Sequence, residues 1–242
     1  MQWGYRYRPA ASPRAWLVWG LVLGLLAALS GPTFAYTFSD IEQHWARDSI
    51  KRLAESGLLE VYPDGLFRPD RPITRAEFAQ MATAAFALQE GLPRVFTDAQ
   101  DHWARQELSI LVDHGVLQVG SDGTIRPDAT LTRAEVGQAV ITLLGLQGVS
   151  ERVAALDTPR FEDVPANHPA FGAVQMAARL NLFPPFLRGR LLPDEFITRG
   201  ETAYILDQAL RLERASGRLE RVDTERHVLW LSVPNGTERS FP

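Results

Sequence analysis

One short motif occurs three times in this chain, and each copy carries an arginine at the same place. The copies read Thr74-Arg75-Ala76-Glu77, Thr132-Arg133-Ala134-Glu135 and Thr198-Arg199-Gly200-Glu201. Threonine followed three residues later by glutamate predicts a capping box, which satisfies free N–H groups at the start of a helix. The threonines and glutamates are therefore predicted to be structural. The arginine falls at the first helical position, where the helix dipole disfavours a cation, so capping does not explain it.

The arginines are suited to binding a carboxylate, because free N–H groups at a helix start and a guanidinium group both favour an anion. We therefore predict that Arg75, Arg133 and Arg199 bind an anionic ligand. The alternative is that each arginine forms an ion pair with a carboxylate of another copy. The two interpretations differ in outcome, since replacing a ligand contact weakens binding and replacing an internal ion pair weakens the fold.

Other residues recur with the arginines. Two interpretations apply to Trp45 and Trp103, which either stack on a sugar ring or pack in the core. Three histidines around a threefold axis would suit zinc geometrically, but each precedes a helix in the same local context. We therefore expect loop bracing and no metal site from His44, His102 and His168. The same bracing role is expected for Asp40, Asp98 and Asp163.

The spacing of these residues shows internal repetition. Phe38 recurs as Phe96, 58 residues later, and the same offset relates Thr74 to Thr132. A third copy begins at Phe161 and reaches Thr198, with one residue inserted relative to the first copy. Three motifs in the same order and at fixed spacing predict three tandem repeats.

Each repeat is predicted to be a helix, a loop and a second helix. After Trp45, apolar residues recur at helical spacing, and Gly57 supplies the left-handed position that ends the helix, where copy three has Asn181. A turn sequence with Asp64 and Gly65 follows, and the second helix starts at Thr74. One such unit has too little apolar surface to be stable alone, so the three copies should share one core.

The predicted domain boundaries follow from this pattern. The repeats are placed at 36–88, 94–146 and 159–212, with a short linker between the first two and a looser one over 145–160. Beyond the third repeat, residues 213–242 predict a short β segment with an Asn235-Gly236 turn. The fold class is thus mainly α, with a small β tail.

The first 35 residues are predicted to be a signal peptide. Arg6, Arg8 and Arg14 precede an unbroken apolar run at 15–29, which is shorter than a spanning helix needs. The alternative is an uncleaved membrane anchor. Either interpretation predicts export, with the rest of the chain at the cell wall, the cell surface or in the periplasm.

The composition excludes several function classes. The chain has 242 residues, a formal net charge of −4 and no cysteine, which excludes disulfides, thiolate metal sites and cysteine nucleophiles. The acidic balance argues against nucleic acid as a partner. The sequence carries no nucleophile-elbow, zinc-protease or phosphate-loop motif, so we predict a non-catalytic protein without a cofactor.

Taken together, the motifs resemble the S-layer homology domain. Its usual pattern runs Phe-x-Asp, His-Trp-Ala, a Gly-Tyr-x-Asp-Gly-x-Phe-x-Pro loop and Thr-Arg-Ala-Glu, and copy one matches nearly all of it. The resemblance implies a pseudo-threefold helical bundle. It also implies non-covalent binding of cell-wall polysaccharide, often through a pyruvylated sugar in grooves between repeats. Asp64, Gly65, Trp45 and Trp103 then join the arginines as expected ligand-binding residues.

Copies two and three depart from the family pattern. Gly120 replaces Tyr62, Pro169 replaces the tryptophan, and Arg188 replaces Asp64. We therefore expect Arg199, in the most divergent copy, to matter least for binding.

Three functions compete at this stage. The first is a wall-anchoring module, with wall polysaccharide and other envelope or surface-layer proteins as partners. The second is a scaffold that links membrane to wall through an uncleaved amino-terminal helix. The third is a wall-lytic enzyme, which a turnover assay on purified wall would detect.

Overall fold

The structure is a computed structural model. It describes residues 38–59, 62–89, 94–154, 158–187, 189–215, 219–223, 228–232 and 238–241. The chain divides into two units, residues 1–35 and residues 36–242, and all described residues belong to the second. The predicted signal peptide and its cleavage site therefore lie outside the described residues.

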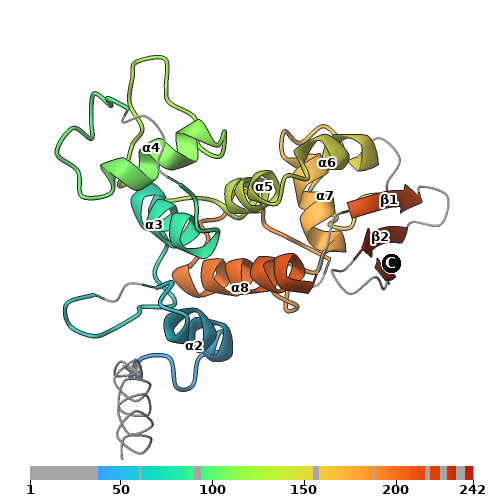
Figure 1. Ribbon diagram of the computed structural model, residues 1–242, viewed down its shortest axis with the longest axis horizontal. Helices are drawn as coiled ribbons and strands as arrows, with labels where there is room; N and C mark the ends of the chain where they lie inside the picture. The colour runs from blue at the N-terminus through green and yellow to red at the C-terminus, as the bar shows by residue number, and fades with distance from the viewer. Residues whose placement is uncertain are drawn as a thin grey trace, which may run out of the picture. The chain divides into compact units, whose positions relative to one another are not determined.

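The described chain is mainly helical, which confirms the predicted fold class (Figure 1). Each repeat contributes two helices joined by a loop. They are α2 (Arg47–Glu55) and α3 (Arg75–Ala85), α4 (Arg105–Asp113) and α5 (Arg133–Leu143), and α7 (Phe171–Arg179) and α8 (Arg199–Ala215). Among the described helices, none is long and apolar enough to cross a membrane.

The first helix of each repeat ends in the same way. Gly57 and Gly115 follow α2 and α4 with φ near +70°, and Asn181 follows α7 with φ +54°. A left-handed residue at this place turns the chain sharply out of the helix. Glycine and asparagine tolerate that conformation best, which is why the sequence pattern located these ends.

A closed ring of backbone hydrogen bonds joins the three repeats in front of their second helices. Ile73 N–H donates to Ile197 O (3.0 Å), Ile197 N–H donates to Leu131 O (2.9 Å), and Leu131 N–H donates to Ile73 O (3.1 Å). Each repeat therefore donates one of these hydrogen bonds and accepts one. The ring makes the threefold relation of the copies a property of the backbone, independent of their side chains.

The free N–H groups at the start of each second helix are also used between repeats. The first two N–H groups of α3 donate to Ala129 O and Pro127 O of copy two, at 2.9 Å each. Those of α5 donate to Glu195 O and Pro193 O of copy three, and those of α8 donate to Arg71 O and Pro69 O of copy one. These donors therefore hold the neighbouring copy in place, although the sequence had suggested that they were free for an anion.

The copies share one hydrophobic core. Buried side chains from all three repeats form a single cluster, in which Phe38, Phe67, Phe78 and Phe96 are almost fully buried. The first helix of each copy packs on the second helix of the copy before it, so α4 contacts α3, α7 contacts α5, and α2 contacts α8. No copy completes its own core, as expected for a repeat protein.

Two further elements lie outside the repeated pattern. The linker predicted over 145–160 contains a helix, α6 (Gln147–Ala154), where the sequence suggested only a loose connection. Leu146 and Val149 pack against the shared core, which explains why this segment is ordered as a helix. The β tail forms β1 (Leu219–Asp223), β2 (Val228–Ser232) and β3 (Glu238–Phe241), in an antiparallel sheet of order β1-β2-β3. The predicted Asn235-Gly236 turn lies outside the described residues.

Candidate ligand-binding grooves

The loop between the two helices of each repeat is held by an aspartate. Both carboxylate oxygens of Asp40 accept backbone N–H groups, from Phe67 (3.1 Å) and Arg68 (2.6 Å). Asp98 binds the N–H groups of Ile125 and Arg126 in the same way, and Asp163 binds those of Leu191 and Leu192. The second residue of each pair has a positive φ, at +57°, +53° and +55°. The aspartates therefore hold a backbone conformation that these side chains would otherwise avoid.

The histidines belong to the same bracing system. Nδ1 of His44, His102 and His168 accepts the backbone N–H two residues on, at 3.1 Å in each copy. Nε2 lies near an exposed aspartate of the same copy, at 3.2 Å from Asp70 in copy one. Within the described residues, no group of three histidine, aspartate or glutamate side chains could hold a metal ion.

The motif threonines and glutamates form capping boxes at all three second helices. Thr74 Oγ1 accepts the N–H of Glu77, and the Glu77 carboxylate accepts the N–H of Thr74 at 3.0 Å. Thr132 with Glu135 and Thr198 with Glu201 repeat this arrangement. In each capping box one carboxylate oxygen is used, which leaves the other available for a second partner.

Each arginine reaches into the next copy. Arg75 Nε donates to Ile125 O of copy two at 2.8 Å, and Arg199 Nε donates to the equivalent Phe67 O of copy one at 2.9 Å. The loop of copy three consequently faces Arg133 of copy two and not Arg199. The loop divergence of copy three therefore lies beside Arg133, and the expectation that Arg199 matters least for binding stays a prediction.

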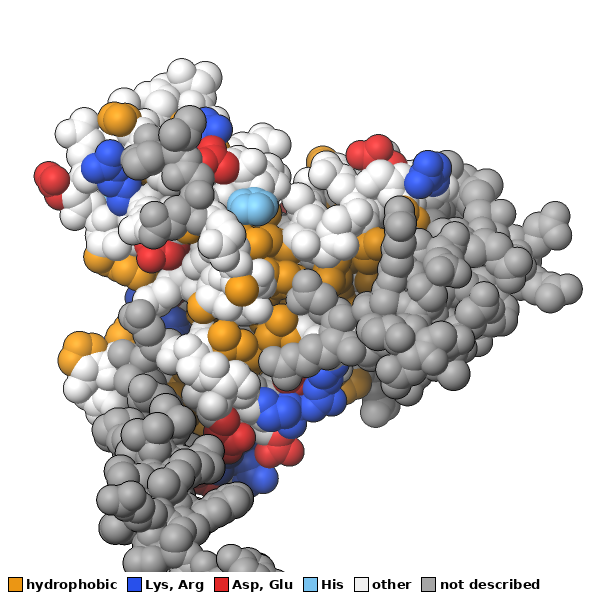
Figure 2. All heavy atoms as spheres, in the orientation of Figure 1, with side chains coloured by type: hydrophobic (Ala, Val, Ile, Leu, Met, Phe, Trp, Pro, Cys, Tyr) orange, Lys and Arg blue, Asp and Glu red, His pale blue; other side chains and the backbone are white. Residues whose placement is uncertain are grey.

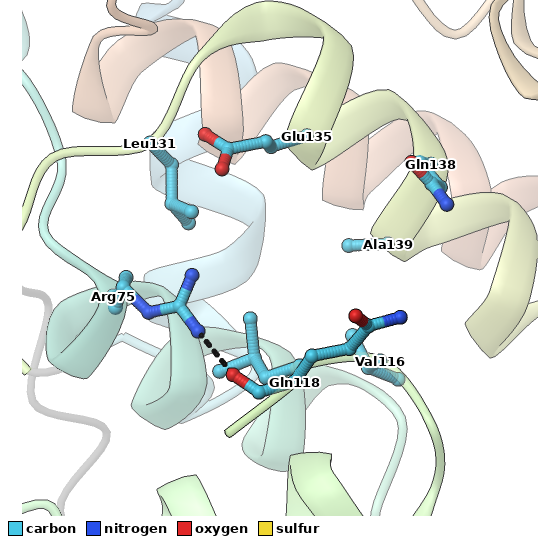
Figure 3. Close-up of a pocket in the computed structure, with 8 residues that line it drawn as sticks. Arg75, Val116, Gln118, Leu131, Glu135, Gln138 and Ala139 are labelled. Carbon is cyan, nitrogen blue, oxygen red and sulfur yellow. Dashed lines mark hydrogen bonds between the residues drawn. The ribbon is translucent and has the colours of Figure 1, made fainter. Parts of the chain in front are cut away.

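A cavity of about 310 Å³ opens between copies one and two (Figure 3). Its lining combines one arginine, one glutamate, two glutamines and four apolar side chains: Arg75, Glu135, Gln118, Gln138, Val116, Leu117, Leu131 and Ala139. Arg75 Nη2 donates to Gln118 O at 3.2 Å, as the dashed line in Figure 3 marks. Burial lowers the pKa of Arg75, because a cation is disfavoured away from water. The cavity therefore contains a partly desolvated cation, where an anion would be bound more strongly than at the open surface.

The equivalent place between copies three and one is filled by protein. Arg199 is 4% exposed, its Nη1 lies 3.6 Å from Glu77 Oε1, and its guanidinium carbon lies 4.8 Å from the Tyr62 ring centre. The Tyr62 hydroxyl donates to Glu77 and accepts from Arg71 Nη1. Burial opposes ionisation of Glu77, but hydrogen bonds from Tyr62 and the Thr74 N–H, with the charge of Arg199, hold its pKa below the usual range.

Between copies two and three, the arginine is paired internally. Arg133 Nε donates to Glu201 Oε1 at 2.9 Å, and the two side chains are 14% and 4% exposed. Nη1 of Arg133 is buried and has no hydrogen-bond partner among the described residues. At Arg133 and Arg199, the structure thus contains the inter-copy ion pair that the sequence analysis left open as the alternative.

The two tryptophans are exposed, so the interpretation that they pack in the core does not apply. Trp45 is 45% exposed and Trp103 is 58% exposed. Trp45 contacts aromatic rings of copy three, with ring centres 4.9 Å from Phe186 and 5.6 Å from Tyr204.

Apolar side chains also gather near the middle of the face shown in Figure 2, with small mixed groups of charged side chains nearer its edges. Whether the tryptophans stack on sugar stays a prediction.

Asp64 and Gly65 form a local turn. The Asp64 carboxylate accepts the N–H of Leu66 at 3.1 Å and a bond from Arg68 Nη2 at 2.6 Å. The backbone bond from Leu66, more than the arginine, lowers the pKa of Asp64. Gly65 has φ +76°, which a side chain would disfavour. These contacts explain both residues structurally, and their ligand-binding role stays a prediction.

The fold and the grooves define a repeat protein whose copies meet around inter-copy clefts. The family model of the S-layer homology domain matches residues 37–79, 95–136 and 160–203, which together make up more than half of the chain. The chain therefore belongs to the S-layer homology domain family. This confirms the resemblance that the repeated motifs had indicated.

Relatives of known function share only part of their length with this chain. It is 33% identical over 165 residues to the cellulosome-anchoring protein of Acetivibrio thermocellus, covering 64% of this chain and 35% of that protein. It is 32% identical over 195 residues to cell surface glycoprotein 1 of the same organism, covering 75% of this chain and 8% of that protein. It is 30% identical over 108 residues to S-layer protein EA1 of Bacillus anthracis, covering 43% of this chain and 12% of that protein. The chain thus spans about a third or less of these proteins.

Proposed function

We propose that this chain binds a cell-wall polysaccharide non-covalently and thereby stays attached to the cell envelope. The observation that carries the proposal is the cavity between copies one and two, with Arg75 on one side and Glu135 on the other. The family membership and the anchoring and surface roles named for its relatives support the same function.

The lining of the cavity matches the chemistry of a sugar. In the part of the chain that the structure describes, no side chain or carbonyl accepts a hydrogen bond from Arg75 Nη1. Glu135, Gln118 and Gln138 are exposed and supply acceptors and donors for hydroxyl groups. The apolar side chains of the same lining suit the C–H face of a ring. A cavity of this size holds a monosaccharide unit of a longer chain.

The finer proposal is that the bound sugar carries a carboxylate, such as a pyruvyl ketal. A carboxylate on Arg75 Nη1 would make a charge-assisted hydrogen bond in a partly dry site. A glycosidase would need two carboxylates flanking the bond to be cut. Glu135 is the one carboxylate among the residues lining this cavity, which supports binding without catalysis.

A pull-down on purified cell wall tests the proposal. We expect the protein to sediment with untreated wall and to stay in solution when the secondary polysaccharide has been removed chemically. Wall from which only the acid-labile ketals have been removed tests the finer proposal, and binding should then fall strongly. Equal retention on wall with and without its polysaccharide would reject the proposed function, whereas equal retention without ketals would reject only the carboxylate.

A further inference from the structure

We propose that this chain has one functional groove, the one at Arg75, and that ion pairs between copies hold the arginines of the other two. The inference rests on the proposed function and restricts it: three copies of the binding motif provide one binding site. Arg133 and Arg199 then serve the fold. The grooves at Arg199 and Arg75 differ in the residue at one loop position, which is Tyr62 in the first and Gly120 in the second.

The arginines of the three grooves differ in their partners. In all three grooves, the arginine of one copy faces the capping-box glutamate of the next. Arg133 and Glu201 are 2.9 Å apart, and Arg199 and Glu77 are 3.6 Å apart. The equivalent residues Arg75 and Glu135 form no ion pair within the described chain, and they lie on different sides of the cavity in Figure 3. Only there is the glutamate separated from the arginine, so that a ligand can enter between them.

The charged groups of the three grooves also differ in their accessibility to a ligand. Arg199 and Glu201 are each less than 5% exposed, and the Arg133 side chain is 14% exposed. A polysaccharide could reach these groups only after a buried ion pair had been separated, and leaving buried charges unpaired is costly. Arg75 is half-buried and Glu135 is exposed, so both present polar atoms to a ligand without such a rearrangement.

The side chain that closes the groove at Arg199 comes from the loop of copy one. Tyr62 and Gly120 occupy the same backbone turn: the N–H of each donates four residues on, to Leu66 O and Thr124 O, and each carbonyl accepts from the glycine three residues on. In copy one, the Tyr62 side chain extends from this turn over Arg199 and donates to Glu77. In copy two, Gly120 has no side chain to cover Arg75. The missing side chain therefore leaves the groove open.

The open groove also indicates what its ligand must offer. Arg75 supplies a cation on one side, and Glu135 supplies a hydrogen-bond acceptor on the other. A group that satisfies both carries a carboxylate close to a hydroxyl donor, as in an acidic monosaccharide unit. A ligand with two carboxylates would place one of them against Glu135, where like charges repel.

Isothermal titration of the full chain tests the inference, with the single repeating unit of the wall polysaccharide, released chemically, as the probe. We expect one unit bound per chain. Arg75→Ala should weaken binding roughly 10- to 100-fold, because it removes a charge-assisted bond. Gly120→Tyr should also weaken binding, because the new ring would cover Arg75. The atom nearest to the added Cβ is Asp122 Oδ1, at 2.5 Å, and this side chain would turn away at the expense of its hydrogen bonds from Thr124. Arg47→Ala, which removes a partly exposed arginine that does not line the cavity, is the matched control and should bind normally.

Thermal melts of every variant show which of them are folded, and only the affinities of folded variants are compared. Two or three units bound per chain would overturn the inference, as would normal affinity in folded Arg75→Ala. Normal affinity in a folded Gly120→Tyr variant would overturn the role of that position. These failures differ from failure of the proposed function, in which the unaltered chain is not retained on purified wall.

Discussion

The groove at Arg75 and the groove at Arg199 contain equivalent structural elements, but the first is open to a ligand and the second is closed by protein side chains. Both have a capping-box helix start, an arginine directed into the next copy, and the same loop turn. In one, a cavity separates the arginine from the glutamate; in the other, Tyr62, Glu77 and Arg71 enclose the arginine. In these two grooves the loop position near the arginine carries Tyr62 at Arg199 and Gly120 at Arg75, and we propose that this difference leaves Arg75 available to a ligand.

The comparison also shows that a repeated motif does not imply a repeated role. All three arginines begin a helix, and all three make contacts in the next copy. The three arginines differ in the residue that each contacts in the next copy. Roles in a repeat protein are therefore assigned at the interface between copies, where the partner residues have diverged.

The largest effect is expected from removing the charge of Glu201. In Glu201→Gln, the amide keeps the capping bond, but buried Arg133 loses its carboxylate. Breaking a buried ion pair in this way destabilises by roughly 3–5 kcal/mol. The matched variant Glu135→Gln, at the open groove, should change stability by less than about 0.5 kcal/mol, since its exposed carboxylate forms no ion pair with any residue that the structure describes. Urea unfolding of both variants measures the difference, and equal losses would contradict the distinction between the grooves.

A smaller effect is expected at the closed groove of copy one. Tyr62→Phe removes the hydroxyl between Glu77 and Arg71 and should destabilise by about 1 kcal/mol. It should also change the response to acid. The folded-state pKa of Glu77 is lowered, so its contribution to stability is present above the unfolded-state pKa and is lost as pH falls through the folded-state pKa.

Because the Tyr62 hydroxyl helps to lower that pKa, the phenylalanine variant should lose less stability on acidification than the unaltered protein. Unfolding free energies measured from neutral to acidic pH provide the check. Parallel pH curves for the two proteins would show that the hydroxyl does not stabilise the Glu77 carboxylate.

The smallest effect on the fold is expected at Trp103. Its side chain is 58% exposed, so Trp103→Ala should change stability by about 0.5 kcal/mol or less. Trp45→Ala should cost more, because Trp45 packs on Phe186 and Tyr204 of copy three. Calorimetric melts compare the two variants. If Trp103→Ala melted well below Trp45→Ala, exposure would be a poor guide to the role of these residues.

Much of the fold could be predicted from the sequence, because it depends on local signals. Threonine and glutamate at capping spacing marked the second helices, and Gly57 and Asn181 marked the ends of two first helices. The bracing roles of the aspartates and histidines followed from their repeated place before each helix. The helix α6 was not found, since its stability depends on packing against a core that no local pattern describes.

The site was harder to predict, because its contacts join residues far apart in the chain. The bond between Arg133 and Glu201 and the contact between Arg199 and Tyr62 depend on which copies are neighbours. Asp207 is a further example: it binds Ser49 and Arg52 from the other end of the repeats. Aligning each motif with the loop of the following copy would have brought Arg75 and Gly120 together, and the substitution of Tyr62 would then have indicated an open groove.

The closed ring of backbone bonds has a consequence for the order of assembly. Ile73 receives from Leu131 and donates to Ile197, so the first copy cannot be completed until the last one is present. Bringing residues this far apart in sequence together costs chain entropy before any contact compensates for it, which slows folding. A chain emerging from its amino terminus therefore remains without its finished core until nearly all of its helices have been synthesised. Partial products would expose apolar surface, and a cut within the third copy would affect the first as severely as the third.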